Sequence, residues 1–421
     1  MRGAVRRGEA SDNNRWLALA ACSMGFLVAN IHRISPGVYA SELMQEFNTS
    51  ASVLGLLSSS YFYTYGLLQI PVGLMCDRFR PGRVVGISML ASVAGSVWFS
   101  MSRGLLEAML ARILLTAGIS SVFIAAVRIF GYAFAKGGFS LATGVMVAAG
   151  SVGGIAALAP LAIFVERFGW RSSMLATAAI TLAVAVLILY STDRYKPGTM
   201  GKSEEGRGAR FSLKDGRKDY MLMLYGLSFA LMLQYGAQMG YQGLWGVPFL
   251  MDIYGFTKVA AGNILTYASL GAVAGSAFIG WLVDSKRTSA HNLMLWSASL
   301  VFLSWVPMCL KLEANVQFTL SAAALVLGGA SSFTAILNPT FANSFIDDSS
   351  RGRFFGILNS SAMVGASIFQ PLMGLIIDSS IKGPAGIQAG YFASFRLALA
   401  CSFLVLLTRV AIYFRYRRLT I

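Results

Sequence analysis

The residue types that usually carry out catalysis or bind metals are scarce in this chain and do not cluster. Among its 421 residues, only two are histidine and four are cysteine. The cysteines have no paired spacing, so the sequence predicts neither a disulfide framework nor a metal site. Two histidines are also too few for an ordinary histidine-ligated metal centre. We therefore expect no metal, no cofactor and no enzymatic activity.

Two groups of polar residues recur at helical spacing and could line a path for a solute. Tyr61, Tyr65 and Gln69 are four residues apart, which places them on one face of a helix. A second group with helical spacing comprises Gln234, Gln238, Tyr241, Gln242 and Trp245. Amides and phenols suit a water-filled path that must bind and release a solute. The alternative is that both groups only form hydrogen bonds between neighbouring helices.

The composition shows what kind of molecule must position these residues. Hydrophobic residues make up 56% of the chain and charged residues 12%, and the mean hydropathy is +0.64. A soluble domain carries roughly 25% charged residues, so this chain lacks the polar surface of a water-facing globule. The composition predicts a polytopic membrane protein. It excludes a soluble enzyme, a nucleic-acid-binding domain and a disordered scaffold.

Twelve apolar stretches are long enough to cross a bilayer, which takes about 20 residues. Their ranges are about 16–44, 51–75, 83–102, 105–133, 139–164, 171–191, 219–250, 257–282, 291–311, 315–342, 354–377 and 388–414. The hydrophilic stretch 192–218 is rich in Gly, Lys and Arg and is typical of a flexible linker. We expect an all-α membrane protein with two six-helix bundles, 16–191 and 219–414, flanked by tails at 1–15 and 415–421.

The distribution of basic residues predicts how the spans are oriented. If the amino terminus is cytoplasmic, 23 of the 34 Lys and Arg residues fall on the cytoplasmic side and seven on the opposite side. Cytoplasmic loops carry such an excess during membrane insertion. Both termini are therefore expected in the cytoplasm, and the protein is expected in the plasma membrane, specifically the bacterial inner membrane. The same loops account for the net charge of +16 without a nucleic-acid partner.

The two halves repeat a loop motif. Gly73 and Asp77 end the second span, and Gly280 and Asp284 end the eighth, 207 residues later, each pair being followed by basic residues. Such a repeat suggests two bundles around a pseudo-two-fold axis with the site between them. The loop at 73–83 resembles the signature loop of the major facilitator superfamily, from which it departs at Arg80 and Gly82. The resemblance covers nearly the whole chain, includes a second pattern from Arg112 to Gly118, and implies that family's fold and transport function.

The repeated loops are candidates for a gate. Asp77 could pair with an arginine or lie near a helix N-terminus, and Gly73 would allow a second helix to approach closely. The alternative for the loop is a topogenic basic segment, and for Arg112 a structural hydrogen-bond hub. The residues assigned to gating are Gly73, Asp77, Arg78, Arg83, Arg112, Gly280 and Asp284.

Arg33 is the strongest candidate for a substrate ligand. It lies near the middle of the first span beside His32, and no acidic residue lies at the same depth. A charge at the bilayer centre costs at least about 2.5–3.5 kcal/mol, so its presence requires a reason. An anionic solute in a wet cavity would supply the missing partner. The alternative is pairing with helix carbonyls or with Glu42.

We therefore expect a secondary transporter that moves a small polar, anionic organic solute by alternating access. The resemblance implies organic acids, sugar phosphates, amino acids or small peptides as candidates. No carboxylate lies near mid-membrane, so coupling could use exchange with a counter-transported anion, uniport, or protons carried by His32 or the solute. Alternatives are a multidrug or metabolite efflux pump and a non-transporting solute sensor. The expected partners are the solute and membrane lipid, and the protein is expected to be a monomer.

Overall fold

The computed structural model describes residues 12–134, 138–193, 195, 217–284, 289–343, 348–381 and 386–416, and it contains only helices and their connections over these residues. The predicted all-α architecture is thereby confirmed. The predictions for most of the amino-terminal tail, most of the linker 192–218 and most of the carboxy-terminal tail lie outside the described residues.

The amino-terminal half contains one helical unit for each of the six predicted spans. Its helices are α1 (Asp12–Ile34), the short η1 (Ser35–Gly37), α2 (Ala40–Glu46), α3 (Ala51–Arg78), α4 (Pro81–Met101), α5 (Leu105–Ile119), α6 (Val122–Ala133), α7 (Phe139–Ala156) and α8 (Ala159–Thr192). The fourth predicted span is divided between α5 and α6. The fifth is divided between α7 and the first part of α8, and the sixth corresponds to the rest of α8.

Two breaks set these divisions, at the start and in the middle of α8. The fifth span was expected to run to residue 164, but the chain leaves helical geometry at Leu158 (φ −108°, ψ −107°). Pro160 follows in the first turn of α8, a position that suits a residue without an amide hydrogen. A second break occurs at Gly169, whose φ of +79° favours glycine. The sixth span therefore begins directly after Gly169.

The carboxy-terminal half repeats the arrangement. Its helices are α9 (Arg217–Gly240), the π-helical η2 (Tyr241–Trp245), α10 (Gly246–Tyr254), α11 (Lys258–Asp284), α12 (Ala290–Trp305), the short η3 (Pro307–Cys309), α13 (Val316–Asn343), α14 (Asp348–Ile381) and α15 (Gly386–Tyr416). The units α9 to α10 form the seventh predicted span as one continuous helical path with a π-helical turn inside it.

Nine helical stretches in the described part of the chain are long and apolar enough to cross a membrane. Two of the predicted spans outside that group are α3 and α9, which carry the two polar stripes. These two helices are less hydropathic than the others because part of each carries polar residues, where the other spans carry apolar residues that face lipid or core. The protein is an integral membrane protein.

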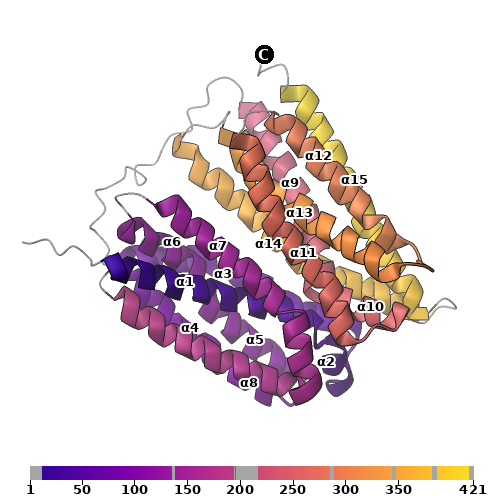
Figure 1. Cartoon of the computed structure of the whole chain (residues 1–421), viewed down its shortest axis with the longest axis horizontal. Coiled ribbons are helices and arrows are strands. Elements are labelled where there is room, and N and C mark those ends of the chain that lie inside the picture. The colour runs from indigo at the N-terminus through magenta and orange to yellow at the C-terminus, as the bar shows by residue number, and fades with distance from the viewer. Residues whose placement is uncertain are drawn as a thin grey trace, which may run out of the picture.

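The two halves form two groups of helices that meet at one end of the molecule and diverge at the other (Figure 1). The closed end is where α2 and α10 lie, and the open end is where α1 begins and α15 ends. Contacts between the halves are made mainly by α3 with α14 and by α7 and α8 with α11. A site between the halves is therefore accessible from the open end.

Candidate functional site

A cavity of about 560 Å³ lies between the two halves. Its walls come from α1, α3, α5, α6 and α7 on one side and from α9, η2, α11, α13 and α14 on the other. Polar lining residues from the first half include Asn30, Arg33, Tyr61, Tyr65 and Ser151, and those from the second half include Tyr235, Gln238, Gln242, Ser269 and Asn359. The cavity therefore presents hydrogen-bonding groups from both bundles to one central space.

Among the described residues that line this cavity, Arg33 is the sole charged one. One terminal nitrogen of its guanidinium donates to the side-chain oxygen of Asn30, one turn earlier on α1. Its Nε atom is buried and has no hydrogen-bond partner among the described residues. Glu42, the acid considered as an alternative partner, instead pairs with Lys258. Arg33 thus presents an uncompensated positive charge to the cavity.

The tyrosines of α3 stand beside this charge. The rings of Tyr61 and Tyr65 are stacked, with centroids 5.9 Å apart and planes 10° apart. The Tyr61 hydroxyl donates weakly to the Ala29 carbonyl oxygen at 3.4 Å. Gln69, the third residue of the predicted stripe, does not line the cavity, because its amide donates to the Ser120 carbonyl oxygen at 3.4 Å. The cavity face of α3 is therefore shorter than the sequence predicted.

The stripe on α9 and η2 is partly displaced from the predicted face. Gln238 and Gln242 line the cavity, and Gln242 donates to Ser269 Oγ at 3.0 Å. Tyr241 and Trp245 are instead fully buried in the second half. Residues 241–245 form a π-helical turn, and Gln242 is the one residue of this described turn that lines the cavity. The prediction of which residues share one face assumed a regular α-helix through this turn.

Gln234 and His32 also face away from the cavity. The Gln234 amide donates to Thr334 Oγ1 at 3.0 Å, so it supports a residue that does line the cavity. His32 is buried on the face of α1 that packs against α8, with Nε2 3.4 Å from Thr181 Oγ1. The structure therefore brings Arg33, Tyr61, Tyr65, Gln238 and Gln242 together. It does not bring His32, Gln69, Gln234, Tyr241 or Trp245 to the same space.

The closed end is held by contacts between the two halves. Asp378 of α14 accepts hydrogen bonds from the first two amides of α3, Ala51 N at 2.9 Å and Ser52 N at 2.8 Å. Lys258 of α11 pairs with Glu42 of α2. A Cβ atom on Gly55 would lie 2.6 Å from Pro371 Cα, so the backbones of α3 and α14 touch there. This packing seals one end of the cavity.

The predicted gate residues of the two repeated loops lie at the open end, and those that the structure describes show no contact between the halves. Arg112, the remaining predicted gate residue, lies instead in the middle of α5. A Cβ atom on Gly73 or on Gly280 would meet no atom within 4 Å in the described part of the chain. The close approach expected at Gly73 is therefore not made in this conformation. Asp77 pairs with Arg128 of α6, within the same half. Asp284 is the last residue of α11, and its side chain lies outside the described residues.

The loop between α3 and α4 joins helices within the first half. Arg80 Nη1 and Arg83 Nε donate to the Asp193 carboxylate at 3.0 and 2.6 Å, and the hydrogen bonds from Arg83 and Arg80 lower the pKa of Asp193 below its ordinary value. A Cβ atom on Gly82 would lie 2.0 Å from Thr192 Oγ1, so only glycine fits there. These contacts give a physical reason for the two departures from the family's signature loop.

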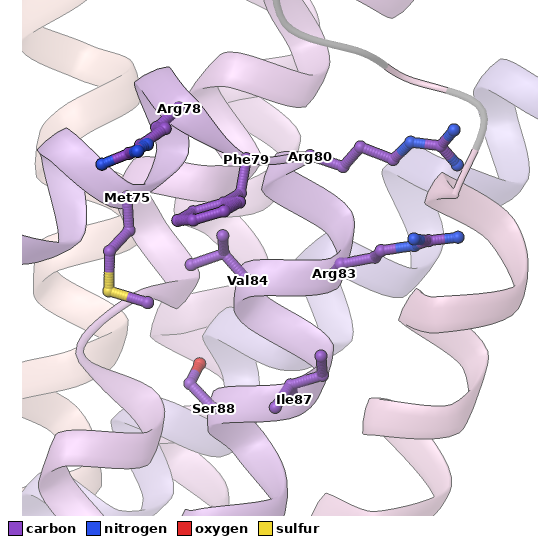
Figure 2. A pocket seen from close by; sticks show the side chains of 8 residues that line it. All are labelled: Met75, Arg78, Phe79, Arg80, Arg83, Val84, Ile87 and Ser88. Atoms are coloured by element: carbon purple, nitrogen blue, oxygen red, sulfur yellow. The ribbon is translucent and has the colours of Figure 1, made fainter.

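A second hollow of about 670 Å³ lies at this loop, separate from the central cavity (Figure 2). Met75, Phe79, Val84 and Ile87 form its apolar wall, and the arginine side chains extend away from it on both sides. Arg78 lies over the Phe79 ring, with Cζ 5.9 Å from the ring centroid. The hollow does not contain the polar residues of the predicted substrate path.

The sequence analysis missed Asn30 and Tyr235 as cavity residues. Asn30 is three residues before Arg33, so the i, i+3 spacing on a helix could have identified it. Tyr235 follows the series 231, 235, 238 and 242, which is the cavity face of α9 in the structure. The predicted series included Gln234 instead because it lies four residues before Gln238.

Comparisons with known proteins agree with this architecture. The fold matches the structure of a bacterial homologue of the human lysosomal transporter Spinster, in an inward-facing and occupied conformation, with a TM-score of 0.75, 17% identity and 98% of each chain covered. The probable sulfoacetate transporter SauU of Cupriavidus necator is 22% identical over 381 residues, which cover 86% of this chain and 87% of the relative. The membrane sensor protein UhpC of Escherichia coli is 23% identical over 279 residues, covering 62% and 63%.

A family model extends this likeness to nearly the full length of the chain. The model described as Major Facilitator Superfamily matches residues 17–242 and 227–418, which together include both helical halves. Because the match covers far more than half of the sequence and the fold agrees with it, this protein belongs to the major facilitator superfamily.

Proposed function

We propose that this protein is a secondary transporter that carries a small anionic organic solute through the central cavity by alternating access. The observation that carries the proposal is Arg33, a cation whose Nε donor has no partner in the described part of the chain and which lies in a cavity whose described lining residues include no acid. A charge in such a place is stabilised when an anion enters with it. The solute's acidic group would bind Arg33, and the rest would contact Tyr65, Gln238 and Gln242.

Two further observations support an anionic substrate and a direction for the open end. SauU, whose name gives sulfoacetate as its probable substrate, resembles this chain over most of both lengths. The excess of Lys and Arg on one side of the predicted spans supports cytoplasmic termini. With that orientation, the open end faces the cytoplasm of a bacterial cell, and the conformation described above is the inward-open one.

Ligand binding can be measured by thermal unfolding of the purified protein. Sulfoacetate is compared with a neutral and a cationic compound of similar size, using wild type, Arg33→Gln and Arg167→Gln. Arg167 is an exposed arginine far from the cavity residues, so it controls for loss of one positive charge. We expect an anion to raise the midpoint of wild type and Arg167→Gln but not of Arg33→Gln. An equal response of all three would contradict the role of Arg33.

Two alternatives make different predictions in the same assay. An efflux pump for apolar cations would be stabilised by the cationic compound, which the charge of Arg33 opposes. A sensor would bind the anion without moving it, and the resemblance to UhpC, named as a membrane sensor, is the reason to test this case. Uptake of a labelled anion into proteoliposomes separates a sensor from a transporter.

A further inference from the structure

Arg112 is a buried cation that the proposed transport path does not use. It lies in the middle of α5, its side chain is 1% exposed, and it does not line the cavity. Within the described residues, its Nε and Nη2 atoms have no hydrogen-bond partner. These two nitrogens form one edge of the guanidinium, which matches the two oxygens of an acidic group. The unfilled donors are therefore arranged as a fork.

The carboxylates whose surroundings the structure describes are engaged elsewhere or exposed. Glu42 pairs with Lys258, Asp77 with Arg128, and Asp193 with Arg80 and Arg83. The remaining ones that accept a hydrogen bond or form an ion pair are Glu46, Glu107, Asp252 and Asp378. Glu166 and Glu313 are exposed. Within this part of the chain, no acid is left to neutralise Arg112.

The described groups around Arg112 are polar but uncharged. The Tyr39 hydroxyl, which lies 2.8 Å from Ser35 Oγ, is near the Arg112 guanidinium. The Nδ1 atom of the His32 ring is also buried and has no hydrogen-bond partner in the described part of the protein. The Tyr61 ring lies 5.9 Å from Arg112 Cζ, and Tyr61 also lines the central cavity. Tyr61 therefore stands between Arg112 and the solute path.

We infer that the Nε–Nη2 edge of Arg112 binds a second anionic group, distinct from the group held by Arg33. The occupant is either a small free anion such as chloride or a second acidic group on the transported solute, and the latter source rests on the proposed function. Both sources supply the same chemistry, a compact negative charge that accepts two parallel N–H bonds. A purely structural hub would have its adjacent donors filled by protein acceptors.

The first test uses chloride and the purified protein. Chloride replaces a bulky buffer sulfonate at constant ionic strength, and the unfolding midpoint is recorded for wild type, Arg112→Gln, Arg33→Gln and Arg167→Gln. If a free anion occupies the fork, chloride raises the midpoint saturably, by about 2 °C or more. Arg167→Gln keeps the whole rise, and Arg33→Gln keeps a saturable rise because its fork at Arg112 is intact. Arg112→Gln has a smaller rise than wild type, and combining it with Arg33→Gln abolishes the rise. Arg112→Gln is also expected to be at least as stable as wild type without chloride, because it removes an uncompensated charge.

The second test uses two solutes that differ by one acidic group, sulfoacetate and its neutral-amide analogue sulfoacetamide. If the second group of the solute occupies the fork, wild type binds the diacid at least about tenfold more tightly than the monoacid, the scale of one charge-assisted bond of about 1.4 kcal/mol. Arg112→Gln then binds both equally, while Arg33→Gln weakens both. If Arg33→Gln binds both solutes as tightly as wild type does, the proposed function is contradicted. The chloride result then remains the test of the site at Arg112.

The proposal is overturned if Arg112→Gln responds to chloride and to the diacid as wild type does. It is also overturned if wild type responds to neither the chloride titration nor the second acidic group. Should Arg112→Gln fail to fold, Arg112→Lys serves in its place, because it keeps the charge but lacks the two-donor fork. Arg112→Lys is expected to bind the anion at least about tenfold more weakly.

Discussion

The position of the Arg33 guanidinium depends on a short chain of hydrogen bonds on one face of α1. The Asn30 amide nitrogen donates to the Phe26 carbonyl oxygen at 2.8 Å, which fixes the direction of its oxygen. That oxygen accepts from Arg33. A Cβ atom on Gly150 would lie 2.8 Å from the same amide nitrogen, so α7 confines Asn30 as well. Asn30 is therefore a positioning residue for the proposed anion ligand.

Asn30→Asp tests this arrangement with almost no change of shape. The new carboxylate would pair with Arg33 and neutralise the charge that the solute needs, so we predict loss of anion binding with an unchanged or higher unfolding midpoint. Asn30→Ala, which leaves Arg33 charged but loosely held, should weaken binding by only about threefold to tenfold. Titration of both variants with sulfoacetate measures the difference. Equal affinities for Asn30→Asp and wild type would contradict a charge-based role.

At the scale of single elements, the start of α3 depends on a side chain from the other half of the molecule. Ser50, at the N-cap position, forms no side-chain cap, and the Asp378 carboxylate of α14 accepts from the Ala51 and Ser52 amides instead. A carboxylate at a helix N-terminus also interacts favourably with the helix dipole. When the closed end opens, α3 must lose this cap. The contact therefore stabilises one conformation specifically.

Asp378→Ala should weaken the closed end by about 1 kcal/mol, the usual worth of a helix cap. A loss of this size changes the equilibrium constant between the two conformations about fivefold. It favours the conformation that is open at the end where α2 and α10 lie. Labelling of a cysteine placed at Ser52 reports accessibility at this end. We expect faster labelling in Asp378→Ala, with Glu313→Ala as an exposed acidic control. Equal rates would show that the cap does not bias the conformation.

Elements were predicted well where the sequence repeats a local pattern, and poorly where the backbone departs from it. The stripe on α3 gave Tyr61 and Tyr65 because that helix is regular through the cavity. On the seventh span, the π-helical turn at 241–245 changed the phase, and Tyr241 and Trp245 turned into the core. A π-helical turn has no strong sequence signal, so the phase after it could not be derived from spacing.

For the whole molecule, glycine contacts show which end is closed. Gly55 lies against Pro371 and Gly374 lies against Ala51, whereas the described surroundings of Gly73 and Gly280 are open. The two repeated loops thus lie at the open end in corresponding positions of the two halves. A rocking motion of the halves would exchange the two situations, bringing the Gly73 and Gly280 loops into contact while the Gly55 contact separates.

Substituting alanine at the two ends should have opposite effects. A methyl group at Gly55 would lie within 2.6–2.8 Å of the α14 backbone, so Gly55→Ala is predicted to disfavour the present conformation. Gly73→Ala meets open space here and is predicted to disfavour the opposite one. Spin labels at Leu74→Cys and Trp281→Cys measure the separation across the open end. We expect the distance between the two labels to be shorter in Gly55→Ala than in wild type. In Gly73→Ala we expect no shortening of this distance. A change of the same sign in both variants would contradict the rocking model.

The global architecture could be predicted because hydrophobic runs and a duplicated motif recur along the entire sequence. The two bundles and the central location of Arg33 follow from those signals. The partners of long-range contacts could not be derived from them. The cap on α3 joins residues more than 300 positions apart, and the Arg128 partner of Asp77 lies on a helix that the loop motif does not identify.

The central claim, transport of an anion through Arg33, is tested most directly by counterflow in proteoliposomes. Vesicles loaded with unlabelled sulfoacetate are diluted into labelled sulfoacetate, and accumulation is compared between wild type, Arg33→Gln and Arg167→Gln. The account predicts accumulation by wild type and Arg167→Gln and a loss of at least about tenfold in Arg33→Gln, the effect of removing one charged hydrogen bond. Accumulation by Arg33→Gln at the wild-type rate would contradict it.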